Sequence, residues 1–194
     1  GIPYKIVGGQ RFYDRKEIKD MLAYMSIVAN EQDDLRLRRI INEPARKIGA
    51  TTVQNVADIA AGLGVSMLEV IEHAPDYPAL ARASAALGGF WRIYRRLKEA
   101  YDTMSLDVFV SEILEITGYR SMLEAEGEEG QTRMENIGQL VSSVKTYADQ
   151  RGPEASLPGF LEEVALISDI DSYDEGADVV VLMTMHAAKG LESV

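Results

Sequence analysis

Apolar residues recur at helical intervals along most of the chain, and this pattern predicts a mainly helical protein. The first such set is Ile18, Met21, Leu22, Met25 and Val28. Asp14 and Glu17 precede it at the spacing of a capping box, in which two side chains near a helix start satisfy free backbone N–H groups. We therefore expect a helix that begins just after Asp14.

Turn and capping residues mark the next helices. Thr51–Gln54 and Ser66–Glu69 both have capping-box spacing, and Gly64 between them suits the residue that follows a helix end. An earlier apolar set ends ahead of Pro44, whose ring disfavours helical geometry in the residue before it. The helices expected from these signals span Leu35–Ile41, Val53–Leu63 and Met67–His73.

A long apolar stripe in the middle of the chain predicts the centre of the hydrophobic core. Pro78 suits a first helical turn. The stripe after it consists of Leu80, Ala83, Leu87, Trp91, Tyr94, Leu97 and Tyr101. Ser105 is then placed to cap a helix that carries Val108, Ile113 and Ile116 and ends at Gly118. Two later helical sets are Ile137, Leu140, Val141, Val144 and Tyr147, and Phe160, Leu161, Val164 and Ile167.

Only two segments have an extended pattern, and they lie at opposite ends of the chain. Tyr4–Val7 is followed by two glycines, and Val179–Met183 is an apolar run that meets polar residues at Thr184 and His186. In open α/β sheets, ligands bind beyond the carboxyl ends of the strands. We therefore expect a helical domain inserted between two strands of another, α/β domain.

Composition narrows the class of protein further. The 194 residues carry a net charge of −11, contain no cysteine and only two histidines, and include no apolar run long enough to span a membrane. Disulfides and thiolate metal sites are excluded, no metal site is expected, and we expect a cytoplasmic protein. The start at Gly1 without methionine and the end just after Ser193 predict a piece of a longer protein.

Charge is unevenly distributed. One basic cluster lies between Arg36 and Lys47 and contains Arg36, Arg38, Arg39, Arg46 and Lys47. A second consists of Arg92, Arg95, Arg96 and Lys98. Either cluster is explained by the solvated face of an amphipathic helix. Acidic residues dominate Glu124–Glu129 and Asp169–Asp178, which we interpret as solvated loops.

Several separated motifs resemble the second half of superfamily 1A DNA helicases, the group of bacterial UvrD, Rep and PcrA. They are GIPYKIVGGQRFYDRKEIKDMLAYM at the start, PARKIGATT and TRMENIGQL inside, and VVLMTMHAAKGLE at the end. In that family a RecA-like motor domain, 2A, is interrupted by a mainly helical insertion, 2B. The resemblance thus implies that residues 1–25 and 179–194 belong to 2A and residues 26–178 form 2B.

The closing segment resembles helicase motif V, which faces both single-stranded DNA and nucleotide. The resemblance implies that Thr184 and His186 contact single-stranded DNA, that Gly190 and Glu192 contact ATP, and that Lys189 holds the turn between them. A single histidine at such a position is more often a packed residue. Ser193 departs from the family, where an aromatic residue is usual, and is either natural variation or a cloning junction.

Lys47–Thr52 resembles the Gly-Ile-Gly element of 2B that contacts duplex DNA. The resemblance implies a duplex contact by Lys47, Gly49, Thr51 and Thr52. Flanking cations at Arg38, Arg39 and Arg46 favour this interpretation over an ordinary capped turn. Lys47 stands where the family usually has glycine.

A further segment, at Arg133, Glu135 and Asn136, matches another family motif. An ion pair between Arg133 and a neighbouring acid on the helix surface explains these residues equally well.

The implied function is that of an ATP-dependent 3′ to 5′ DNA helicase in repair or replication, with ATP and Mg as cofactors, single-stranded and duplex DNA as partners, and repair proteins as further partners. No P-loop sequence occurs, so we expect this chain alone to bind no nucleotide and to be inactive as an ATPase. An alternative is a non-catalytic regulatory or protein-interaction module. A free-standing helical domain without a helicase parent is a third.

Overall fold

The computed structural model describes residues 9–168, and within them all regular secondary structure is helical. The two predicted terminal strands lie outside this part of the chain. The elements are α2 (Gly9–Asp14), α3 (Lys16–Ala29), α4 (Asp34–Ile40), α5 (Ala50–Leu63), α6 (Met67–Glu72), η1 (Ala74–Asp76), η2 (Pro78–Ala83), α7 (Ser84–Thr103), α8 (Leu106–Thr117), α9 (Tyr119–Glu124), α10 (Glu128–Arg151), η3 (Gly152–Glu154) and a helical segment at 157–168.

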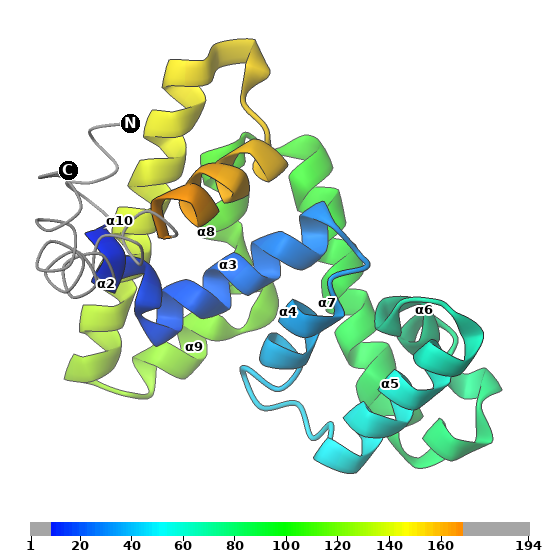
Figure 1. Cartoon of the computed structure of the whole chain (residues 1–194). Coiled ribbons are helices and arrows are strands. Elements are labelled where there is room, and N and C mark those ends of the chain that lie inside the picture. Colours follow the sequence, from blue (N-terminus) through cyan, green and yellow to red (C-terminus); the bar gives the residue numbers. More distant parts are fainter. Residues whose placement is uncertain (1–8, 169–194) are drawn as a thin grey trace, which may run out of the picture.

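The hydrophobic core is organised around α3. This helix packs against α4, α7, α8 and α10, and it lies across the front of the molecule in Figure 1. Its apolar side chains Ile18, Met21, Met25 and Ile27 are fully buried. Burial of one such side chain stabilises the fold by roughly 1.5–3 kcal/mol, so the periodic apolar face fixes where α3 sits. The helix crosses the predicted domain boundary at residue 25 without interruption.

Two groups of helices lie on either side of α3. The first contains α5, α6, η1 and η2, which pack among themselves and against the start of α7. The second contains α8, α9 and α10. The long helix α7 contacts both groups, and Figure 1 shows it in green between them. The stripe predicted over η2 and α7 faces the core, since Leu80, Leu87, Tyr94 and Leu97 are buried and its other members are partly buried.

Several predicted helix ends are confirmed. The Ser66 side chain accepts a hydrogen bond from the Glu69 N–H at 3.1 Å, as its capping-box position requires. Gly64 and Gly118 follow α5 and α8 with φ values of 68° and 83°, the left-handed conformation that glycine adopts without strain. The helix before Pro44 ends at Ile40.

Two predicted caps are wrong, and a third is in place without its hydrogen bond. Asp14 is the last residue of α2, and α3 starts at Lys16 after Arg15, which makes no capping bond. The short helix before α3 therefore takes the place of the expected cap. Thr51 lies inside α5, which begins at Ala50. Ser105 occupies the N-cap of α8 but its side chain makes no capping hydrogen bond.

Periodicity also assigned some residues to the wrong environment. Leu35 and Val108 were expected on buried faces, yet they are 69% and 45% exposed. Both stand in the first turn of their helices, where a side chain can leave the core without breaking the pattern. The acidic stretch Glu124–Glu129 is solvated as predicted, but half of it is helical because α9 ends at Glu124 and α10 starts at Glu128.

Candidate nucleic-acid interface

The turn between α4 and α5 is held in shape by Asn42. Its side-chain oxygen accepts the N–H of Ile48 at 3.1 Å and that of Arg46 at 3.4 Å, and its amide donates to the Ile48 carbonyl. The Ile48 side chain is 1% exposed and anchors the turn in the core. The neighbours of Ile48, Lys47 and Gly49, are exposed. The turn therefore presents these two residues to solvent from a fixed backbone.

Arg46 points into the domain rather than out of it. Its guanidinium group donates to the carbonyl oxygens of Ile40 at 2.8 Å and Thr117 at 3.1 Å, and to the Tyr24 hydroxyl at 2.6 Å. It also lies over the rings of Tyr24 and Phe90, at 5.8 and 5.4 Å from their centroids. Arg46 was predicted to flank the DNA contact as a cation. That interpretation is wrong, because these contacts tie it to the helical core.

Lys47 has a φ of 61° and is the one residue other than glycine with positive φ in the described part of the chain. The left-handed conformation costs a residue with a Cβ roughly 1–2 kcal/mol. Glycine adopts it freely, which explains why glycine is usual at this position in the family that the sequence resembles. The departure at Lys47 therefore leaves the turn intact and adds an exposed cation to it.

Gly49 is the N-cap of α5, and nothing in its backbone conformation or packing requires glycine. Its φ and ψ of −66° and 163° are accessible to any residue, and a Cβ added there would meet nothing within 4 Å. No side chain caps the helix, and the first backbone bond runs from the Val53 N–H to the Gly49 carbonyl. The N–H groups of the first turn are thus left to an outside acceptor. Such a helix start favours an anion such as phosphate.

The threonines next to Gly49 stand on this open helix start. Thr51 is exposed and Thr52 is half-buried, both within the first turn of α5. Their hydroxyls are additional donors beside the free N–H groups. The structure thus brings Lys47, Gly49, Thr51 and Thr52 together on one exposed turn, the arrangement that a contact with a phosphate backbone needs.

The two flanking arginines of α4 differ in their surroundings. Arg38 is exposed, and its guanidinium group donates to the Gln54 side chain on α5 at 3.0 Å. Arg39 donates instead to the Asp20 carboxylate at 2.9 Å, and Asp20 is 1% exposed. A buried carboxylate needs such a partner, so most of the charge of Arg39 is compensated inside the fold. Arg38 and Lys47 remain the cations that this surface offers to a ligand.

Asp20 is the centre of a polar network that joins α3 to α4 and α9. Besides Arg39, it accepts from Lys16 at 2.8 Å and from the Tyr119 hydroxyl at 2.6 Å. Burial, followed by this hydrogen bond, raises the pKa of Tyr119 far above its usual value. Burial also raises the pKa of Tyr24 to about 12, against the opposing effect of Arg46. Both phenols therefore stay protonated and donate to their acceptors.

A second internal network joins the start of α3 to α10. The Asn136 side chain accepts from Arg15 at 2.7 Å and donates to the Glu17 carboxylate at 2.8 Å. Glu17 and Asn136 are both buried. Arg133 forms ion pairs with Glu126 and Glu129 at 2.7 and 2.8 Å on the surface of α10. The surface ion pair predicted for Arg133 is confirmed, and Asn136 acts inside the fold.

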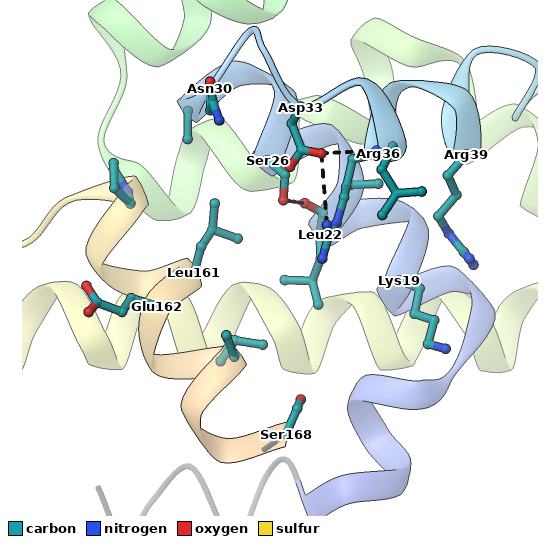
Figure 2. Close-up of a pocket in the computed structure, with 16 residues that line it drawn as sticks. Lys19, Leu22, Ser26, Asn30, Asp33, Arg36, Arg39, Leu161, Glu162 and Ser168 are labelled. Carbon is teal, nitrogen blue, oxygen red and sulfur yellow. Dashed lines mark hydrogen bonds and ion pairs between the residues drawn. The ribbon is translucent and has the colours of Figure 1, made fainter. Parts of the chain in front are cut away.

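A groove in the described part of the chain lies away from this turn. It has a volume of about 850 Å³ and runs between α3, α4 and the helical segment at 157–168 (Figure 2). Lys19, Leu22 and Arg36 line one wall, and Leu161 and Glu162 line the other. None of the predicted site residues except Arg39 contributes to it.

The predicted motif V residues are at the C-terminal end of the chain. Thr184, His186, Lys189, Gly190 and Glu192 lie outside the described residues. Within residues 9–168, no group of three or more acidic or histidine side chains is arranged to hold a metal ion. No helix among them combines the length and the apolar character needed to cross a membrane.

Of the residues that shape the turn, Asn42 had a recognisable signal. A polar amide at a helix end, two residues before proline, is typical of a side chain that closes a turn. Tyr24 had no such signal, because its partners lie 16 or more residues away, and for Asp20 only the pairing with Lys16 on the same helix was recognisable.

Comparison with known proteins identifies the family. The sequence profile described as UvrD-like helicase C-terminal domain matches residues 1–193. The ATP-dependent DNA helicase PcrA of Bacillus subtilis (strain 168) is 43% identical over 99% of this chain and 27% of its own length. The PcrA proteins of Staphylococcus aureus (strain Mu50) and Staphylococcus epidermidis are 40% and 38% identical, each over 98% of this chain and 26% of their own length. The chain thus spans about a quarter of these relatives, and it belongs to the family of UvrD-like helicase C-terminal domains.

Proposed function

We propose that this chain is part of an ATP-dependent DNA helicase that moves 3′ to 5′, and that its α4–α5 turn holds the duplex ahead of the fork. The family and the PcrA relatives, which are named as ATP-dependent DNA helicases, support the parent activity. The open start of α5 beside Lys47 supports the role of the turn. Residues 26–178 form the helical insertion in this proposal, and the flanking segments belong to the motor domain.

The turn is suited to a backbone contact that does not depend on DNA sequence. Free N–H groups at a helix start, two threonine hydroxyls and one lysine all address phosphate oxygens. Contacts to phosphate oxygens position a protein on DNA but carry no sequence information directly. A helicase must bind DNA of any sequence, and contacts to the phosphate backbone allow this.

The fixed geometry of the turn also matters to this function. Arg46 holds the backbone on one side of Lys47 through hydrogen bonds to Ile40, Thr117 and Tyr24. Asn42 holds the other side by accepting the Ile48 N–H. The donors at Gly49 and beyond are therefore oriented before DNA arrives, and little ordering is needed on binding.

The remaining functional residues belong to the motor part of the proposal. Thr184 and His186 would contact single-stranded DNA, and Gly190 and Glu192 would contact ATP. The P-loop that would hold ATP and Mg is absent from this sequence, so these residues complete a nucleotide site that other parts of the helicase supply.

The duplex contact is tested by removing one charge from the turn. Fluorescence anisotropy of a labelled duplex with a 3′ tail, measured from 30 to 200 mM salt, gives the affinity and its salt slope. One lost phosphate contact lowers the slope by about 0.9, so Lys47→Gln should show that decrease and bind roughly tenfold more weakly at low salt.

Lys145→Gln is the matched control. Lys145 is exposed on α10, forms no ion pair in the described part of the chain, and carries the same charge. It should leave the slope unchanged. Equal slopes for the two variants and the unmodified chain would contradict the duplex contact, and absence of any binding at 30 mM salt would favour the regulatory module instead.

A further inference from the structure

A second basic surface lies along α7 and takes no part in the turn. It is formed by Arg92, Arg95 and Arg96, which are all exposed. The buried residues of α7 that alternate with them at helical spacing are Leu87, Phe90, Tyr94, Leu97 and Ala100. The three arginines therefore project from the side of α7 that faces away from the core. We call this the α7 arginine face.

The three guanidinium groups have no acidic partner. None of them forms an ion pair or a side-chain hydrogen bond with any residue that the structure describes. Glu99 is exposed one turn further on and remains unpaired with them. Although the chain has a net charge of −11, these three neighbouring arginines create a local positive potential. No acidic side chain in the described part of the chain pairs with them, so the potential is available to a ligand.

The backbone next to these arginines is unusually bare. Gly88 and Gly89 precede Arg92 in the same helix, and a Cβ added at either would meet only the Arg92 guanidinium, at 3.5 and 3.8 Å. Neither has positive φ, so neither conformation nor packing inside the domain accounts for them. Two glycines in a helix interior lower its stability. Their effect here is to leave room for the Arg92 guanidinium close to the helix backbone.

The chemistry of this face favours a polyanion backbone over a protein partner. No large hydrophobic residue of α7 is exposed, and the centre of a protein interface normally contains apolar or aromatic anchors. Arginine forks match phosphate oxygens in bidentate fashion. Trp91 packs against Tyr94 with ring centroids 5.4 Å apart, so it is not free as a stacking platform for unpaired bases. These features together favour duplex DNA as the ligand.

We propose that the α7 arginine face is a second duplex-binding surface, which contacts the phosphate backbone without reading sequence. The inference rests on the proposed function only in taking duplex DNA as the ligand. It is separate from the turn because Phe90, which packs on Arg46, lies on the buried side of α7. The two surfaces should therefore contribute independently to affinity.

The test uses the full 194-residue chain and a labelled blunt duplex of 24 base pairs. Arg92→Gln/Arg96→Gln removes two cations from an exposed helix face and keeps good helix formers in their place. The salt slope should fall by roughly 1.8, twice the effect of one phosphate contact. Lys19→Gln/Lys145→Gln removes the same charge from residues outside both surfaces and should leave the slope unchanged. Circular dichroism should show equal melting temperatures for both double variants.

Comparison of the salt slopes of Arg92→Gln/Arg96→Gln and Lys47→Gln separates this inference from the proposed function. A slope unchanged by Arg92→Gln/Arg96→Gln but lowered by Lys47→Gln would refute the second surface and leave the turn contact intact. The reverse result would support the second surface and refute the turn. A hexaglutamate peptide that competes with the duplex through the α7 arginine face more strongly than an unlabelled duplex of equal charge would also overturn the assignment to DNA.

Discussion

Replacing Arg46 by methionine tests the structural role of this residue. The substitution keeps a long side chain but removes every donor of the guanidinium group. The carbonyl oxygens of Ile40, Ile41 and Thr117 and the Tyr24 hydroxyl then lose a partner. A hydrogen bond from a charged donor contributes about 1.5–3 kcal/mol, and the loss of two or more such bonds costs about 3–5 kcal/mol. We expect Arg46→Met to lower the free energy of unfolding by the latter amount.

Such a loss is large against the whole stability of a domain, which is typically about 5–15 kcal/mol. For a domain of this size it corresponds to a fall in melting temperature of roughly 6–20 °C. Urea titration followed by circular dichroism measures the change directly. Lys47→Gln is the control at the neighbouring position, because Lys47 is exposed and should change stability by less than about 0.5 kcal/mol. A loss of less than about 1 kcal/mol for Arg46→Met would refute the internal role.

Three further predictions concern packing, an unpaired hydroxyl and pH. A Cβ at Gly130 would lie 1.7 Å from the Leu123 carbonyl oxygen, so Gly130→Ala should lower the free energy of unfolding, measured by urea titration, by at least about 2 kcal/mol. A Cβ at Gly138 would meet nothing within 4 Å, so Gly138→Ala should raise that free energy by up to about 1 kcal/mol. Equal effects of the two substitutions would contradict the close contact of α9 and α10. The Tyr94 hydroxyl is buried without a hydrogen bond, so Tyr94→Phe should be neutral or more stable in thermal melts, and a clear loss of stability would show that the hydroxyl has a partner. Burial raises the pKa of Tyr24 from 10.0 to about 12, so the contribution of this phenol to the free energy of unfolding is complete below pH 10. That contribution, about 2–3 kcal/mol at most, should be lost as the pH rises from 10 to 12. A urea midpoint that stays constant over that range would contradict this.

The helices were predictable because their signals are local. Apolar spacing located α3, α7 and α10, and glycines at 64 and 118 marked two helix ends. Caps were less predictable, since Asp14 and Thr51 have the right spacing but neighbouring residues already belong to helices. A side chain can cap only if the backbone at that point leaves the helix, and this depends on contacts elsewhere in the fold.

The candidate interface was predictable in part. A resemblance of Lys47–Thr52 to a known element located the turn, and the open start of α5 agrees with it. Charge alone misassigned Arg46, because a sequence does not show whether a cation faces solvent or a set of carbonyl oxygens on other helices. The same holds for Arg39, whose partner Asp20 is 19 residues away.

The central claim is that an anion binds at the start of α5, and a pair of substitutions at Gly49 tests it most directly. Aspartate and asparagine both fit the backbone conformation and the open space there, and both are good N-caps. They have nearly the same size and differ in one negative charge, which would face the bound phosphate.

We predict that Gly49→Asp and Gly49→Asn fold with equal or slightly higher stability than the unmodified chain. In an anisotropy titration with tailed duplex at 50 mM salt, Gly49→Asp should bind at least about tenfold more weakly than Gly49→Asn, since like charges in contact cost more than about 1.4 kcal/mol. Equal affinity of the two variants, with both folded, would contradict the assignment of this turn as the duplex contact.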